Sequence, residues 1–204
     1  MDRLEYDVIV LTADNDMEWT VRTLLEMRTR ALGIRRVNFS LQRHPNRDNG
    51  VFHDSPDFLR LYVNRAQNAL VLLDREGSGQ ERLSAVEIEE DVESRLQKNG
   101  WKAERSAVVV LDPELEVWVW SDSPHVPRIL GLEPAELELF LSTQPHALTG
   151  KPQKPKEALQ QVLRISGRPF SARIFQELAQ AVSLRTDERA FNKLRNTLQT
   201  WFPP

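Results

Sequence analysis

The chain has 204 residues, of which 40% are hydrophobic and 28% are charged, a composition typical of globular proteins in water. It contains no cysteine, which excludes disulfide bonds, thiolate metal sites and cysteine nucleophiles. No stretch approaches the roughly 18 consecutive apolar residues of a membrane span, and residues 1–5 lack the pattern of a signal peptide. We therefore expect a cytoplasmic protein with no membrane partner.

The net charge of −3 conceals an uneven distribution. Residues 1–149 hold 17 Lys and Arg against 26 Asp and Glu, whereas residues 150–204 hold 10 against 4. A basic segment attached to an acidic body can dock on that body or contact phosphate groups. Because duplex binding normally draws on a broad basic surface, any contact with nucleic acid should be confined to the basic C-terminal part.

In chain order, strand and helix patterns alternate over the first two thirds of the sequence. Continuous runs rich in Val and Leu predict strands buried on both faces of a mostly parallel sheet, and the alternating residues 37–41 predict a strand nearer an edge. Ser84 and Glu87 form a capping-box pattern at the start of an acidic helix. The predicted strands are 7–11, 69–73 and 107–111, the predicted helices are about 14–32, 58–66, 84–99 and 113–120, and residues 43–50 form a polar loop.

From Ser121 onward the pattern predicts helices and loops only. Helical runs lie at 133–141 and around Leu159, and two more begin near Ser171 and Asp187. The sequence therefore predicts a three-layer α/β domain at residues 1–121, with a mostly parallel sheet flanked by helices. The helical C-terminal part, residues 122–204, should pack on it.

Carboxylates follow each of the three buried strands. Because the carboxyl ends of parallel strands meet at one edge of a sheet, these groups should converge there. Clustered carboxylates repel one another unless a hard cation or shared protons offset the repulsion, so the pattern predicts a magnesium site. The acids concerned are Asp14, Asp16 and Glu18 after the first strand, Asp74 and Glu76 after the second, and Asp112, Glu114 and Glu116 after the third.

Each acid also has an ordinary structural interpretation. Asp14 and Asp16 can interact favourably with a helix N-terminus, Asp112 can cap the following helix, and Asp74 can belong to a solvated turn. Glu116 is harder to explain in this way, because it lies among apolar residues, where an unpaired carboxylate is costly.

Two polar segments could complete such a site. His44, in the loop after residues 37–41, could act as a general base or ligand together with Asp48, although a loop histidine is also commonly solvated. Lys151, Lys154 and Lys156 could contact phosphate as point charges, or could be surface lysines of a proline-containing linker.

Taken together, these segments resemble the Toprim-like proteins of prokaryotic defence loci, most closely the small accessory proteins of methylation-associated anti-phage systems. The resemblance implies a Toprim-like fold, in which Asp14 or Asp16 stands for the family's glutamate and Asp74 and Glu76 stand for its acid pair. Glu116 matches the acid of a Glu-x-Trp segment. The chain departs from the family pattern with Asp for Glu after the first strand and Glu for Asp in the pair. The segments that carry the resemblance are 11–18, 44–48, 74–79 and 112–120, with further fits at 151–156 and 201–203.

Two functional hypotheses follow. In the first, the chain is an accessory protein of an anti-phage system and a magnesium-dependent phosphodiesterase acting on nucleic acid. In the second, it is a non-catalytic sensor or scaffold subunit that binds other defence proteins. For the first hypothesis, Mg²⁺ or Mn²⁺ would be held by Asp14, Asp74, Glu76 and Glu116, with His44 or Asp16 assisting catalysis and Lys151, Lys154 and Lys156 binding phosphate.

Overall fold

The computed structural model describes residues 4–204. A parallel sheet has the strand order β2-β1-β3-β4, which confirms the predicted buried strands and the position of the alternating strand at an edge. The strands are β1 (Tyr6–Thr12), β2 (Phe39–Arg43), β3 (Ala66–Asp74) and β4 (Ser106–Leu111).

Helices connect these strands and make up most of the C-terminal part. Between the strands lie α1 (Asn15–Met27), α2 (Thr29–Leu32), α3 (Arg47–Arg60), α4 (Ala85–Lys98) and the 3-10 helix η1 (Ala103–Arg105). After β4 come the 3-10 helix η2 (Leu115–Trp118), α5 (His125–Leu130), α6 (Pro134–Ser142), α7 (Pro155–Ser166), α8 (Ala172–Ala181) and α9 (Arg189–Trp201).

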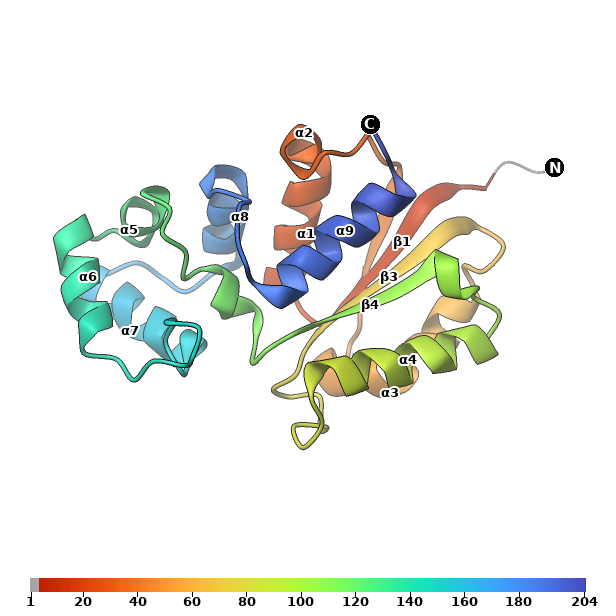
Figure 1. Cartoon of the computed structure of the whole chain (residues 1–204), viewed down its shortest axis with the longest axis horizontal. Coiled ribbons are helices and arrows are strands. Elements are labelled where there is room, and N and C mark those ends of the chain that lie inside the picture. Colours follow the sequence, from red (N-terminus) through yellow and green to blue (C-terminus); the bar gives the residue numbers. More distant parts are fainter. Residues whose placement is uncertain (1–3) are drawn as a thin grey trace.

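The helices cover both faces of the sheet. In Figure 1, α1 and α9 lie on one face and α3 and α4 on the other, which confirms the three-layer α/β architecture. Helices α5, α6 and α7 lie beyond the carboxyl ends of the strands, at the left of the view, and α8 packs beside α1. Within residues 4–204, no helix is long and apolar enough to cross a membrane.

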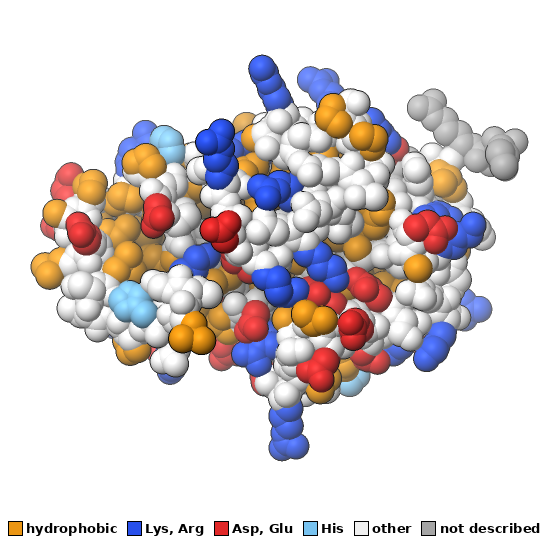
Figure 2. Space-filling model, in the orientation of Figure 1, with side chains coloured by type: hydrophobic (Ala, Val, Ile, Leu, Met, Phe, Trp, Pro, Cys, Tyr) orange, Lys and Arg blue, Asp and Glu red, His pale blue; other side chains and the backbone are white. Residues whose placement is uncertain are grey.

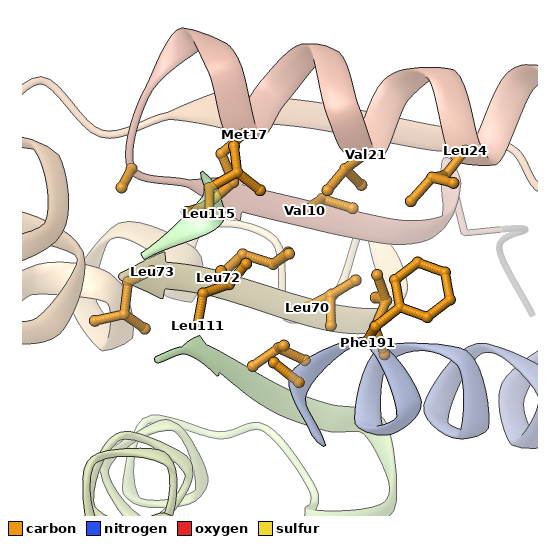
Figure 3. Close-up of a cluster of buried hydrophobic side chains, with 14 of the residues drawn as sticks. Val10, Met17, Val21, Leu24, Leu70, Leu72, Leu73, Leu111, Leu115 and Phe191 are labelled. Carbon is orange, nitrogen blue, oxygen red and sulfur yellow. The ribbon is translucent and has the colours of Figure 1, made fainter. Parts of the chain in front are cut away.

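The core under α1 shows why this sequence folds in layers. Met17, Val21 and Leu24 recur at helical spacing and point onto the apolar side chains of β1 and β3 (Figure 3). Each of the three is at most 2% exposed, and full burial of such a side chain contributes roughly 1.5–3 kcal/mol. Phe191 of α9 joins the same core, so the core includes residues on both sides of position 121. The proposed division into 1–121 and 122–204 stays a prediction.

Charged side chains of α4 and α9 cover the free edge of β4. Glu93 accepts the Val108 N–H and Glu89 accepts the Val110 N–H, both over 2.9 Å. Arg189 donates to the Val110 carbonyl over 2.6 Å. An uncovered edge strand would offer these backbone groups to another chain, so the side chains protect the edge.

The same side chains form a compact set of ion pairs, which we call the edge network (Glu89, Glu93, Arg189 and Lys193). Glu89 lies 3.0 Å from both Arg189 and Lys193, and Lys193 lies 2.9 Å from Glu93. Figure 2 shows Lys and Arg side chains of α9 facing acidic side chains of α4. Opposite charges are thus balanced along this edge.

Some predicted boundaries were wrong. Helix α3 begins at Arg47, inside the predicted polar loop, and ends at Arg60 rather than near Ala66, which opens β3. Most of its polar residues are exposed while Val51 and Phe52 are buried, so the polar composition concealed the helix.

The predicted helix at 113–120 is reduced to η2, and Asp112 does not cap it. The Asp112 carboxylate binds Arg75 over 2.7 Å instead. The predicted capping box of Ser84 and Glu87 is confirmed. The helix expected to begin near Asp187 is α9, which begins at Arg189 after its cap residue Glu188.

Candidate functional site

The two central strands, β1 and β3, each lead into a carboxylate, and the strand order reverses between them. The chain continues from β1 to β2 on one side and from β3 to β4 on the other, and open α/β sheets bind ligands at such a point, beyond the carboxyl ends of the strands. Asp74 is the last residue of β3, and Asp14 closely follows β1. The topology therefore places both acids where a ligand is most expected.

Asp74 is the central carboxylate of this edge. It is 5% exposed, and its Oδ1 atom is buried without a hydrogen-bond partner among residues 4–204. Burial raises the pKa of Asp74 well above its usual value, and the charges of Asp48, Glu116 and Asp14 raise it further. These four carboxylates therefore lie close enough to interact electrostatically.

Asp48 reaches Asp74 from the first turn of α3. The Asp48 carboxylate accepts the backbone N–H of Asp74 over 2.8 Å. Arg47 has a φ of 51°, in the left-handed region that few non-glycine residues adopt, and so turns the chain into the helix. Burial raises the pKa of Asp48 to about 6, although the hydrogen bond from Asp74 lowers it. Asp48 is thus a half-buried acid held against the end of β3.

The segment after β4 contributes two more buried acids. Glu116, in η2, is 2% exposed, and in the described part of the chain its Oε2 atom is buried without a hydrogen-bond partner. Burial raises the pKa of Glu116 to about 7. Glu114 accepts the backbone N–H of Lys156 over 2.8 Å, and burial raises the pKa of Glu114 as well.

Lys156, in the first turn of α7, places a positive charge among these acids. Its Nζ atom lies 3.4 Å from Glu116 and 3.9 Å from Glu114. Burial lowers the pKa of Lys156, but the charges of Glu116, Glu114 and Asp74 outweigh burial and raise it. Lys156 thus stands where a bound cation would also be attracted.

Asp14 and Asp16 complete the cluster from the start of α1. The Asp14 side chain caps this helix by accepting the Met17 N–H over 2.9 Å, so its predicted structural interpretation holds. Burial, followed by the charge of Asp14, raises the pKa of Asp16 to about 6. We call the whole set the acidic rim: Asp14, Asp16, Asp48, Asp74, Glu114 and Glu116.

Glu76 lies outside this buried cluster. It is exposed, and its backbone N–H donates to the Pro113 carbonyl over 2.9 Å. The neighbouring glycines, Gly77 and Gly79, have positive φ and donate their N–H groups to the Glu81 carboxylate over 3.0 and 3.2 Å. An acidic side chain of the chain itself therefore occupies the anion-binding N–H groups of this turn.

His44 packs against α3. It is 5% exposed, its Nε2 atom lies 3.7 Å from Asp54, and its ring centroid lies 5.6 Å from that of Phe58. Its Nδ1 atom accepts the Asn46 N–H over 3.2 Å. These contacts explain why His44 is buried, and its role as a base stays a prediction.

The three predicted phosphate-binding lysines have different surroundings. Lys151 donates to the Val117 carbonyl over 2.8 Å, and Lys154 is exposed and pairs with Glu157 over 2.7 Å. Only Lys156 lies among the carboxylates of the acidic rim.

In the described part of the chain, no group of three or more His, Asp or Glu side chains is arranged to hold a metal ion. Comparison of the chain with protein-family models, with curated proteins and with solved structures gives no match. The interpretation of the acidic rim therefore rests on its own chemistry.

From the sequence, Asp48 was considered only together with His44, Glu114 was not among the predicted metal ligands, and Lys156 was predicted to bind phosphate. Asp48 was concealed by a loop-like composition, and Glu114 by the predicted helix. Lys156 lies 40 residues or more beyond the acids that it approaches, and no local pattern signals so distant an ion pair.

Proposed function

We propose that the acidic rim binds a divalent cation, Mg²⁺ or Mn²⁺, and that the chain is a Toprim-like accessory protein of a prokaryotic anti-phage system that hydrolyses nucleic-acid phosphodiesters. The observation that carries this proposal is the pair of buried, unpartnered oxygens, Asp74 Oδ1 and Glu116 Oε2, within one cluster of acids. Leaving such atoms unpaired is costly, and a cation would supply the missing partner.

The chemistry of the rim suits a hard cation. Mg²⁺ and Mn²⁺ favour carboxylate oxygens, and Asp14, Asp74 and Glu116 would hold the ion, with Asp48 beside them. Glu76 would reach it only from the exposed side. The bound ion would polarise a phosphate oxygen and activate water. Lys156 and the basic C-terminal part would attract the phosphate backbone.

The order of the acids supports a Toprim-like assignment. A carboxylate follows β1, another ends β3, and a third lies beyond β4, all at one edge of a parallel sheet. This order agrees with the expected roles of Asp14, Asp74 and Glu116. The proposed partners are accordingly nucleic acid and other defence proteins, in the cytoplasm.

A non-catalytic sensor or scaffold is the second candidate, and the position of Lys156 favours it. The Lys156 ammonium lies 3.4 Å from Glu116, so the protein neutralises part of its own acidic rim. A chain with this internal cation could keep the fold for contacts with other defence proteins without binding a metal.

Thermal unfolding with Mg²⁺, with Mn²⁺ and with chelator tests the cation site. Saturating metal should stabilise the wild type by about 2–3 kcal/mol, a rise in melting temperature of about 4–12 °C for a chain of this size. Asp74→Asn, which keeps the side-chain shape, should remove most of this gain, whereas Asp57→Asn, at an exposed carboxylate of α3, should preserve it. A wild-type melt unaffected by both ions at millimolar concentrations would overturn the proposed site.

Cleavage assays then separate the two candidates. The phosphodiesterase should cut single-stranded DNA, duplex DNA or RNA with Mg²⁺ but not with chelator, and Asp74→Asn should lose at least about a hundredfold in rate. Metal binding without cleavage of any of the three substrates would favour the non-catalytic candidate.

A further inference from the structure

A cavity of about 60 Å³ lies beside the acidic rim, where η2 and α8 meet α1 and α9. Its walls are mainly apolar, with Leu24, Trp118, Phe175 and Phe191 among the lining residues. About 10–15 Å³ of such space holds one water molecule, so the cavity can accommodate roughly four to six non-hydrogen atoms. Its size suits a small organic molecule rather than a nucleotide.

A lysine with few partners lines this cavity. The Lys151 ammonium donates to the Val117 carbonyl over 2.8 Å, and within residues 4–204 no carboxylate lies in ion-pair contact with it. An ammonium has three N–H donors, so two remain to be satisfied. Burial lowers the pKa of Lys151, although the charges of Glu188 and Asp122 oppose this effect. An anion bound here would offset the cost of burying the charge.

A second polar group in the cavity also lacks a partner. The hydroxyl of Ser121 is buried and forms no hydrogen bond within residues 4–204. The other lining hydroxyls are engaged: Thr20 donates to the Asp16 carbonyl, Ser183 accepts the Arg185 N–H and Thr186 accepts the Glu188 N–H. Within residues 4–204, the cavity therefore combines an apolar body with a hydroxyl that has no hydrogen-bond partner, Ser121, and an ammonium that has a single one, Lys151.

We propose that this cavity binds a small aliphatic carboxylate, with its carboxylate at Lys151 and Ser121 and its alkyl chain among the apolar side chains. A carboxylate accepts both an ammonium and a hydroxyl hydrogen bond. A bare inorganic anion would leave the apolar walls uncovered, and a neutral hydrocarbon would leave both donors unpaired. No acidic side chain lines the cavity within the described chain, so this site differs in chemistry from the acidic rim.

Binding is tested by NMR titration with butyrate, followed through the Trp118 indole signal, with neutral butyramide as the matched probe. Charge-assisted hydrogen bonds are worth enough that butyrate should bind at least about tenfold more tightly than butyramide. Lys151→Met should abolish this preference. Lys154→Met, at the exposed lysine of the same loop, should leave it unchanged.

Two further variants address the remaining contacts. Ser121→Ala should weaken butyrate binding by about two- to tenfold, and Ala179→Leu should block binding by filling the cavity, with circular dichroism confirming that each variant is folded. No butyrate binding at tens of millimolar, equal binding of the two probes, or unchanged preference in folded Lys151→Met would overturn the proposal. The titration is run with chelator, so its outcome does not depend on a cation in the acidic rim.

Discussion

The edge network and the acidic rim both contain carboxylates buried from solvent, but these carboxylates differ in the number of hydrogen-bond and ion-pair partners that they have. Glu89 is 3% exposed and Asp74 is 5% exposed. Glu89 accepts from Arg189, Lys193 and the Val110 N–H, whereas Asp74 keeps one buried oxygen unpartnered. Glu89 is thus paired with two cations, whereas Asp74 lies mainly among other acids.

This difference shows that burial alone does not identify a functional acid. A buried carboxylate with a complete set of partners protects structure, here the edge of β4. A buried carboxylate crowded by other acids stores unfavourable energy that a ligand can relieve. Removing a carboxylate charge should therefore destabilise the protein at the edge network and reduce electrostatic repulsion at the acidic rim.

The largest effect should come from breaking the edge network. Glu89→Ala leaves the Val110 N–H and two cations without their carboxylate and should destabilise the protein by about 3 kcal/mol, a loss of about 6–12 °C in melting temperature. The expected loss is at the low end for a buried pair, because the Arg189 side chain is 40% exposed. Glu90→Ala, at an exposed position of the same helix, is the control in urea denaturation. Equal stability of the two variants would contradict a stabilising role of Glu89 in the edge network.

The acidic rim should make the protein less stable as pH rises. Folding raises the pKa of Asp16 and Asp48 from 3.8 to about 6 and that of Glu116 from 4.5 to about 7. A group whose pKa is raised by folding binds its proton more tightly in the folded state, and this stabilisation is lost as pH rises through the folded pKa. Independent titration of the three groups would remove about 5 kcal/mol of unfolding free energy between pH 5 and pH 8. Because Asp16 and Asp48 are only half-buried and solvent screens their charges, we expect the metal-free protein to lose about 2 kcal/mol.

Urea denaturation with chelator at both pH values measures this loss, and Asp74→Asn should reduce it by removing one repelling charge. A protein whose stability rises over the same interval would show that the rim carboxylates are better paired than the structure indicates.

A smaller effect should distinguish two lysines at the start of α7, Lys154 at its N-cap and Lys156 in its first turn. Lys156→Met removes the cation from the acidic rim and should cost about 1 kcal/mol at pH 8, since its side chain is 41% exposed and solvent screens the charge. The cost should shrink at pH 5, where Glu116, with its pKa raised to about 7, is largely protonated. Lys154→Met removes an exposed pair with Glu157 and should cost less than about 0.5 kcal/mol at either pH. Identical pH profiles for both variants would show that Lys156 does not compensate the charge of the acidic rim.

The strands were the most predictable part of the fold. Residues 69–73 and 107–111 are continuous apolar runs, and burial on both faces of a parallel sheet leaves no other pattern available. Helix α3 was mispredicted because its polar residues resemble a loop. The helix at 113–120 was mispredicted because Asp112 binds the distant Arg75 instead of capping a helix.

The residues of the candidate site also differ in how well the sequence predicts them. Asp14, Asp74 and Glu116 could be predicted from position, since each follows a strand. Asp48 and Lys156 could not, because their places depend on how α3 and α7 pack against the sheet. Glu76 shows the opposite limit: it lies two residues after Asp74 and is exposed, whereas Asp74 is buried.

The edge network also has a consequence for the order in which the protein is made. Lys193 lies 100 residues after Glu93 and 104 after Glu89, so both acids leave the ribosome well before their cations. Until α9 is synthesised, Glu89 and Glu93 of α4 lie at the edge of β4 without their cations, and the Val110 carbonyl lacks its Arg189 donor. The nascent chain thus passes through a stage in which this strand is accessible to chaperones and to other unfinished chains, and the arrival of α9 ends that stage.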